Sequence, residues 1–227
     1  MKYYDYILFD LDGTLTDPAV GITESVIYAL EKSGVTSPER ESLYKFIGPP
    51  LMYSFREYCG MTEEEAARAV GYYRERFSSV GLFENEIYSG VGELLSRLKS
   101  DGTKIILATS KPDVYSERIL EHFDIRKYFF FVAGNTLSES RPEKEDVIAY
   151  AVGSCGIEDT SRAVMVGDRK YDILGGKKFG MKTVGVTYGY GGAEELCEAG
   201  ADELADSVSA LEKILRPHRK NAESVTM

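Results

Sequence analysis

Two aspartates near the start of the chain, Asp10 and Asp12, follow a short apolar segment, and Gly13 comes directly after the second. Residues 6–9 are apolar and rich in aromatic side chains, which predicts a strand covered on both faces. The two carboxylates would point to opposite sides of a continuing strand, but Gly13 permits a tight turn that brings Asp12 round to the side of Asp10. Two ionised carboxylates held that close repel each other unless a cation or a shared proton separates them. The spacing therefore indicates paired carboxylates with a cation or a proton between them.

Polar residues also end two later apolar segments, at Thr109-Ser110 and at Asp168. In open α/β sheets, ligands bind just beyond the carboxyl ends of the strands. Magnesium prefers a few carboxylates, waters and phosphate oxygens, so Asp10 and Asp168 are candidate metal ligands. The hydroxyl and amide of Thr109 and the amide of Ser110, close to the start of a helix, suit a phosphate oxygen.

Short apolar strands alternate with helical patterns along most of the chain. The expected strands are 6–9, 104–109, 129–133, 163–166 and 183–186, with a weaker one at 203–205. The expected helices among them are 113–123, 145–152, 172–179 and 208–215. This alternation predicts an α/β fold with a doubly wound, Rossmann-like parallel sheet and helices on both faces.

The interval 18–86 is the exception, because it has no convincing strand pattern. It carries amphipathic runs instead, at 22–32, 38–47, 51–59 and 62–77, and Thr62 with Glu65 forms a capping-box pattern at the start of the last one. We expect an all-helical cap domain of residues 17–86, inserted into a catalytic core of residues 1–16 and 87–227. Both connections start near the end of the first strand, so the cap is expected to lie over the aspartate pair.

The composition narrows the classes of partner. The 227 residues carry a net charge of −10, and no cluster of Lys and Arg interrupts the sequence, which argues against nucleic-acid binding. The longest apolar run, 128–133, is far too short to cross a membrane. Three widely spaced cysteines without metal-ligand spacing are expected to be reduced, mostly buried thiols, which favours a cytoplasmic protein. We expect a monomer or weak dimer.

Four segments in this order and spacing resemble the haloacid dehalogenase-like phosphohydrolases along nearly the whole chain. They are Phe9-Asp10-Leu11-Asp12-Gly13-Thr14, the expected strand 104–109 followed by Ser110-Lys111-Pro112, Arg141-Pro142-Glu143-Lys144, and Gly167-Asp168-Arg169-Lys170-Tyr171-Asp172. The last three segments are weak signals alone, and their order makes them strong. The resemblance implies the sheet described above, a helical cap, a requirement for Mg²⁺ and a small phosphorylated metabolite as the substrate.

The resemblance also implies roles for the residues of these segments. Asp10 matches the nucleophile, which would form an aspartyl-phosphate, and Asp12 matches the general acid and base, whose backbone carbonyl also binds the metal. Asp172 either starts its helix or caps it as an ordinary aspartate, and the resemblance makes it a metal-site residue that acts through water. The third segment supplies a basic residue that offsets charge among Asp10, the phosphate and Asp168. Many relatives have Lys-Pro where this chain has Arg141-Pro142, but a second family pattern fits Lys144. We choose Lys144 for this role, with Arg141 as the competitor.

The chain looks most like capped relatives known as phosphoglycolate phosphatases and 5′-nucleotidases. Two segments favour a nucleotidase, the turn Gly48-Pro49-Pro50 and the loop of Tyr188 and Tyr190, because tyrosine rings can stack on a planar leaving group. Phosphoglycolate would need a basic cap residue to bind its carboxylate, and the sequence indicates none, because Arg56, Arg74 and Arg76 are expected on solvated helix faces. Lys111, outside the cap, is expected in a loop that faces water.

Three other functions compete with a phosphatase. A phosphomutase of the same fold differs in that it binds its product again in the other orientation. A phospho-aspartate signalling domain also gathers aspartates and a lysine on a parallel sheet, but it is much shorter and lacks a helical insertion. A non-catalytic binding protein of this fold is disfavoured by the full set of Asp10, Asp12, Thr109, Lys144 and Asp168.

Overall fold

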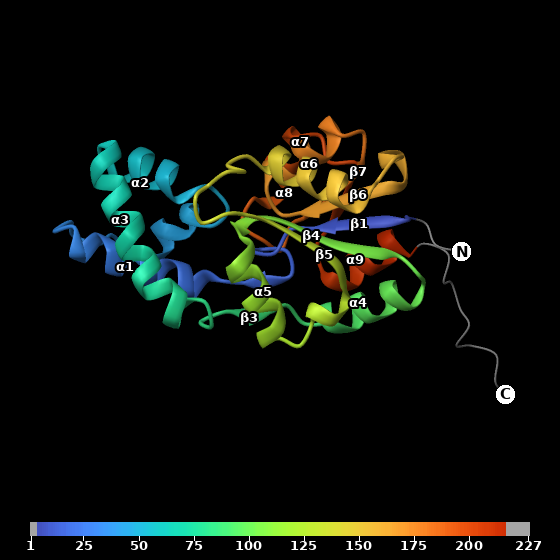
Figure 1. The fold of residues 1–227 in the computed structure, drawn as a ribbon, viewed down its shortest axis with the longest axis horizontal. Coiled ribbons are helices and arrows are strands. Elements are labelled where there is room, and N and C mark those ends of the chain that lie inside the picture. Colours follow the sequence, from blue (N-terminus) through green and yellow to red (C-terminus); the bar gives the residue numbers. More distant parts are fainter. Residues whose placement is uncertain (1–3, 217–227) are drawn as a thin grey trace.

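The computed structural model describes residues 4–216, and its centre is a six-stranded sheet in the order β5-β4-β1-β6-β7-β8. Every neighbouring pair in this sheet is parallel. Its strands are β1 (Tyr6–Phe9), β4 (Lys104–Pro112), β5 (Phe129–Asn135), β6 (Ala163–Gly167), β7 (Lys182–Val186) and β8 (Glu203–Ala205). The predicted doubly wound α/β fold is confirmed, and β1 lies in the middle of the sheet, where both faces are covered (Figure 1).

Alternate residues of the central strands pack into two separate cores. On β1, Ile7 and Phe9 belong to the larger cluster, whereas Leu8 between them belongs to the smaller one. This alternation is the period of a strand that is buried on both faces. Helices therefore cover each side of the sheet (Figure 1), and the carboxyl ends of the strands are left free to carry polar residues.

The helices of the core mostly follow the expected pattern. They are α4 (Val91–Ser100), α5 (Asp113–His122), α6 (Lys144–Cys155), α7 (Lys170–Lys178), α8 (Gly192–Glu198) and α9 (Val208–Leu215), with short 3₁₀ turns η3 (Arg126–Tyr128) and η4 (Thr160–Arg162). Helices α4 and α8 have no counterpart among the expected helices. Helix α7 begins two residues before Asp172, so that aspartate does not start the helix, but it caps it, because its carboxylate accepts from the amide of Arg169 at 3.1 Å.

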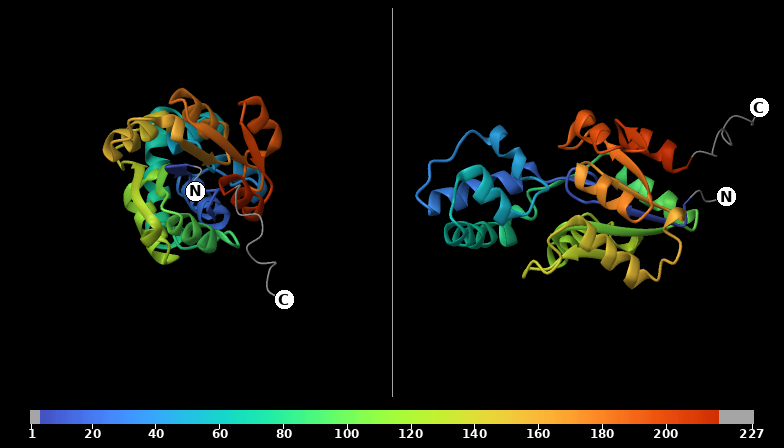
Figure 2. Two further views of the ribbon diagram at one scale, coloured as in Figure 1. Left: turned by 90° about the vertical axis from the view of Figure 1, so that its right-hand side faces the viewer. Right: turned by 90° about the horizontal axis from the view of Figure 1, so that it is seen from above.

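Residues 19–81 form a second group of helices, which we call the helical lobe. It contains α1 (Ala19–Lys32), the 3₁₀ helix η1 (Arg40–Phe46), α2 (Leu51–Cys59), α3 (Glu63–Arg76) and the π-helical turn η2 (Phe77–Gly81). The capping box at the start of α3 is confirmed: the Thr62 hydroxyl accepts from the Glu65 amide at 3.3 Å, and the Glu65 carboxylate accepts from the Thr62 amide at 2.9 Å. The lobe lies to one side of the sheet (Figures 1 and 2).

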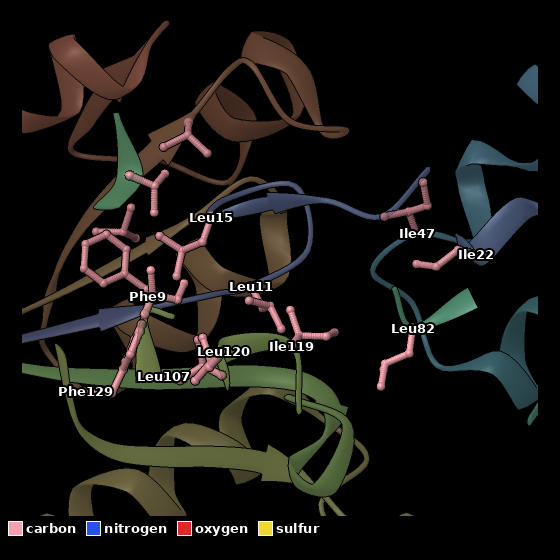
Figure 3. Close-up of a cluster of buried hydrophobic side chains, with 14 of the residues drawn as sticks. Phe9, Leu11, Leu15, Ile22, Ile47, Leu82, Leu107, Ile119, Leu120 and Phe129 are labelled. Carbon is pink, nitrogen blue, oxygen red and sulfur yellow. The ribbon is translucent and has the colours of Figure 1, made fainter. Parts of the chain in front are cut away.

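The two chain connections between lobe and core pair with each other. Strand β2 (Thr16–Asp17) runs antiparallel to β3 (Glu86–Ile87), so the two connections lie side by side. The larger apolar cluster continues across this junction, and Figure 3 shows Ile47 and Leu82 on the lobe side of Leu11. Apolar packing therefore holds the lobe against the end of the sheet where β1 stops.

No helix within the described residues is long and apolar enough to cross a membrane. All three cysteines are free, but the expectation of mostly buried thiols is wrong, because Cys59 and Cys155 are half-buried and Cys197 is exposed.

Candidate active site

Three carboxylates meet at the carboxyl edge of the sheet. Asp10 follows β1 and Asp168 follows the neighbouring strand β6, while Asp172 lies one helical turn further on in α7. One oxygen of each lies within 4.8 Å of the others, and all three side chains are buried. The parallel pairing of β1 with β6 brings together residues that are about 160 positions apart in sequence.

Lys144, at the start of α6, lies between two of these carboxylates. Its Nζ is 2.9 Å from Asp10 Oδ1 and 2.8 Å from Asp172 Oδ1, and it donates to the carbonyl of Ala108 at 3.1 Å. Burial acts to lower the pKa of Lys144, but the two carboxylates outweigh it and raise that pKa above its ordinary value. The ammonium is therefore charged and offsets part of the negative charge.

Arg141, the competitor for this place, lies elsewhere. Its Nε donates to the carbonyl of Gly134 at 2.8 Å, its guanidinium pairs with Asp113 at 3.3 Å, and it stacks on the ring of Tyr150. Of the two basic residues in the third segment, only Lys144 contacts Asp10 and Asp172.

The donor set fits a divalent cation. Burial, and then the charges of Asp10 and Asp172, raise the pKa of Asp168 well above its ordinary value. Its Oδ1 atom is buried without a hydrogen-bond partner. Four carboxyl groups, counting Asp12, gather around two ammonium groups, those of Lys111 and Lys144, so the acidic side chains outnumber the ammonium groups and leave a charge excess for a cation to offset. Hard carboxylate oxygens with this charge excess are what Mg²⁺ binds.

Two close backbone approaches hold Asp168 in this position. Gly13 has φ +80°, and a Cβ there would lie 2.2 Å from Asp168 Oδ2, so the turn after β1 needs glycine for both reasons. The amide of Tyr190, in the loop after β7, donates to the same Oδ2 at 2.8 Å. The loop of Tyr188 and Tyr190 thus orients a candidate metal ligand.

Asp12 makes a different contact from the other aspartates. Its Oδ2 is 2.8 Å from Lys111 Nζ, and Lys111 in turn lies over the ring of Phe77, 4.5 Å from its centroid. Burial raises the pKa of Asp12, and the charge of Lys111 only partly opposes this. The expectation that Lys111 faces water is wrong: its side chain is 6% exposed because the helical lobe covers it.

Thr109 and Ser110 lie in β4, beside β1. Thr109 is buried, and its hydroxyl accepts from the amide of Lys111 at 3.3 Å. Both residues line the same pocket as Asp10 and Asp12. Helix α5 begins three residues after Ser110, at Asp113, so hydroxyl and amide groups gather next to the aspartate pair.

The pocket lies between the core and the helical lobe. Its aromatic lining comes from Phe46, Tyr73 and Phe77 of the lobe and Tyr115 of α5. The turn Gly48-Pro49-Pro50 also lines it. Its remaining lining includes Arg74 of the lobe and Asn135, Thr136 and Glu139 of the loop after β5.

The idea that Tyr188 and Tyr190 stack on a substrate is wrong. Among the described residues that line the pocket, neither tyrosine is present. The Tyr188 hydroxyl donates to the carbonyl of Thr14 at 3.0 Å, and the Tyr190 hydroxyl donates to Asp17. Both tyrosines therefore bind residues close to the junction of core and lobe, and the aromatic side chains of the pocket lining are Phe46, Tyr73, Phe77 and Tyr115.

Two of the three lobe arginines are not simply solvated. Arg76 pairs with Glu84 at 2.7 Å with a side chain only 19% exposed, and Arg74 pairs with Glu139 of the core at 3.0 Å. Arg56 is exposed, as expected. Both carboxylate partners lie outside α3, Glu84 shortly after it and Glu139 in the loop after β5, so the helical pattern of α3 does not reveal them.

Arg169 is a residue that the sequence analysis missed. It follows Asp168, and its Nη1 donates to the carbonyl of Ile47 at 2.7 Å, while its Nε donates to Glu195 at 2.9 Å. It therefore ties the loop that carries Asp168 to the start of the lobe turn at Gly48. Its place directly after Asp168 is the one signal of this role in the sequence.

Known proteins resemble this chain along its length. The sequence profile of a family described as haloacid dehalogenase-like hydrolase matches residues 7–186. A 5′-nucleotidase from Pseudomonas aeruginosa is 40% identical over 215 residues, which make up 95% of this chain and 97% of that protein. The crystal structure of a predicted phosphatase from Clostridium acetobutylicum is 48% identical, with a TM-score of 0.90 and coverage of 93% of this chain and 98% of that one.

A relative with a different name is also similar. The tyrosine-protein kinase PtkA of Mycobacterium tuberculosis is 40% identical over 189 residues, which make up 83% of this chain. The chain spans 64% of the length of that kinase, so the likeness covers less than two thirds of it.

Proposed function

The chain belongs to the haloacid dehalogenase-like hydrolases, and from this premise we propose that it is a magnesium-dependent phosphomonoesterase that works through an aspartyl-phosphate on Asp10. The observation that carries the proposal is the placement of Asp10 and Asp12 together in the lining of one pocket, with Lys144, Asp168 and Asp172 gathered around Asp10. Phosphoryl transfer asks mainly for positioning and charge neutralisation, and this arrangement supports both.

The reaction would proceed in two displacements. A carboxylate oxygen of Asp10 attacks phosphorus, the bond to the leaving oxygen breaks, and Asp12 gives its proton to that oxygen. Asp12 then takes a proton from a water molecule whose oxygen attacks the phosphorus, and the carboxylate of Asp10 is released with inorganic phosphate. The raised pKa of Asp12 favours the protonated form that the first step requires.

Other residues would hold the phosphoryl group and the metal. Thr109, Ser110 and Lys144 are the proposed phosphate-binding residues. Asp10, Asp168 and Asp172, together with the backbone carbonyl of Asp12, are the proposed metal-site residues. Bound Mg²⁺ would supply the positive charge that lets a phosphate dianion approach a cluster of carboxylates.

The helical lobe is the proposed cap, with residues 17–86 as one domain and the rest of the chain as the core. It contributes Phe46, Tyr73 and Phe77 to the pocket, so it would meet the leaving group while the core handles the phosphoryl group. The proposed partner is a small phosphorylated metabolite, and the proposed assembly is a monomer or weak dimer.

Release of inorganic phosphate from a panel of phosphate monoesters, with and without Mg²⁺, tests the proposal. Turnover with stoichiometric phosphate release supports a phosphatase. Formation of an isomeric phosphate ester without phosphate release would identify a phosphomutase. A protein that retains bound phosphate without turnover would be a signalling or binding domain. Because of the similarity to a tyrosine kinase, the panel includes ATP, and phosphotyrosine formed on the protein would argue for that activity instead.

Magnesium removal is expected to abolish most activity. Excess chelator should lower the rate by about a hundredfold or more, since the cation's charge is worth several kcal/mol in the transition state. Asp168→Asn, which keeps an oxygen for the Tyr190 amide, should raise the Mg²⁺ concentration for half-maximal rate and lower the maximal rate. The exposed Asp206→Asn is the matched control and should behave as wild type. Full turnover in excess chelator would refute the metal requirement.

Nucleoside 5′-monophosphates are expected to have higher specificity constants than phosphoglycolate. The support comes from the aromatic pocket lining of Tyr73, Phe77 and Tyr115, because such rings pack against planar groups. Specificity constants for both substrates at equal Mg²⁺ decide the point. A preference of about tenfold or more for phosphoglycolate would contradict the expectation.

A further inference from the structure

An ion pair crosses the pocket from the helical lobe to the core. Arg74 lies near the end of α3, and Glu139 lies in the loop between β5 and α6. Arg74 Nη2 is 3.0 Å from Glu139 Oε1, and the two side chains are 30% and 31% exposed. Both residues line the pocket that holds Asp10 and Asp12. The pair therefore lies where the leaving group of an ester must be accommodated.

The backbone around Glu139 presents this carboxylate from a tight turn. Glu139 has φ +57°, a value that few residues other than glycine adopt. Its amide donates to the carbonyl of Thr136 at 3.0 Å, and the Thr136 hydroxyl accepts from the amide of Ser140 at 2.9 Å. These contacts fix the loop so that Glu139 faces Arg74 and not solvent alone.

Each basic side chain of the pocket lining is already paired with a carboxylate. Of the described residues that line the pocket, the basic ones are Arg74 and Lys111, and each pairs with a carboxylate, Glu139 for the first and Asp12 for the second. A leaving group that carries its own carboxylate would find no unpaired cation there. It would be desolvated beside Glu139, which is costly without a counter-charge. A neutral leaving group with hydroxyl or ring nitrogen atoms meets no such penalty.

We propose that Glu139 is a specificity-determining residue that occupies Arg74 and thereby excludes phosphate esters whose leaving group carries a carboxylate. Like-charge exclusion of this kind is a recognised way to discriminate between similar ligands. The substrates admitted are esters of neutral, hydroxyl-bearing or aromatic alcohols. The inference rests on the proposed phosphatase activity, since it concerns the leaving group of that reaction.

Glu139→Gln tests the proposal, because it removes the competing charge and frees Arg74. Specificity constants are measured for phosphoglycolate, for a nucleoside 5′-monophosphate and for glycerol phosphate, at equal Mg²⁺. Phosphoglycolate should improve by about tenfold or more, the factor that one charge-assisted hydrogen bond is worth, and mainly through a lower KM. The two substrates with neutral leaving groups should change by much less. A loss that is uniform over all three substrates would indicate a merely structural role.

Removal of the arginine supplies the second arm. The double variant Arg74→Met with Glu139→Gln should lose the gain on phosphoglycolate, because the freed cation is gone. Arg74→Met alone should depress phosphoglycolate below its wild-type value, since Glu139 is then an unpaired negative charge. The matched control is Glu75→Gln. Glu75 is an exposed carboxylate that follows Arg74 in α3 and accepts from the Tyr28 hydroxyl, and its substitution should leave all three specificity constants unchanged.

The outcomes separate this inference from the proposal beneath it. A wild-type protein that hydrolyses no ester refutes the phosphatase activity and the inference with it. A wild-type protein that hydrolyses esters, with Glu139→Gln active but unchanged in preference, refutes the inference alone. A gain on phosphoglycolate that survives in the double variant also overturns it. Should Glu139→Gln fail to fold, Arg74→Met alone decides, and an unaltered preference in that variant contradicts the proposal.

Discussion

Asp10→Asn is expected to lower turnover by on the order of a millionfold while the fold is kept, because loss of a nucleophile removes the covalent route entirely. The amide has nearly the same size as the carboxylate but cannot attack phosphorus, and it is a poorer metal ligand. Lys144 loses one of its carboxylate partners and keeps the other, Asp172, so its ammonium is not left unpaired. Phosphate release and thermal unfolding of the purified variant are the two measurements.

The control for Asp10→Asn is Asp206→Asn, which makes the same chemical change at an exposed site. It should match the wild type in both measurements, and this shows that the loss belongs to the position. Substantial turnover by a cleanly purified Asp10→Asn protein would eliminate the aspartyl-phosphate mechanism.

Asp12→Asn is expected to lower the specificity constant for esters with poor leaving groups by roughly a hundred- to ten-thousandfold, the usual contribution of a general acid. The asparagine has no acidic proton to give, and an alkoxide is a poor leaving group without one. For p-nitrophenyl phosphate the loss should be much smaller, since that phenolate leaves without help. The specificity constant is the right quantity, because it reports the steps up to the first phosphoryl transfer.

The comparison of leaving groups carries its own test. Equal losses on p-nitrophenyl phosphate and on an alkyl phosphate would count against Asp12 as the acid. Lys111→Met provides a related comparison, since Lys111 pairs with Asp12 but carries no proton to the leaving oxygen in this account. Its effect should depend less on the leaving group than that of Asp12→Asn.

Most of the fold can be predicted from the amino-acid sequence for a simple physical reason. Buried parallel strands are short apolar runs, and their carboxyl ends meet at one edge, so the strand pattern alone predicts that Asp10, Thr109 and Asp168 lie together. The choice of Lys144 over Arg141 follows from family resemblance, and the structure places only Lys144 near Asp10.

The contacts between the lobe and the core cannot be predicted in this way. Lys111 precedes a proline and looks like a solvated loop residue, but Phe77 of the lobe covers it. Tyr188 and Tyr190 follow a strand that ends near the site, yet their hydroxyl groups bind Thr14 and Asp17. Such partners are set by the packing of one domain on another, and no local pattern encodes them.

The covalent intermediate is the centre of this account, and trapping it is the most direct measurement. Asp12→Asn should still accept the phosphoryl group from p-nitrophenyl phosphate, but it lacks the base that activates water for the second step. Mass spectrometry of the acid-quenched variant should therefore find one added phosphoryl group on the peptide that contains Asp10. This phosphoryl group should require Mg²⁺, and it should be absent from the double variant Asp10→Asn with Asp12→Asn. Steady release of p-nitrophenol by Asp12→Asn with no phosphoryl group on that peptide at any time would contradict the account.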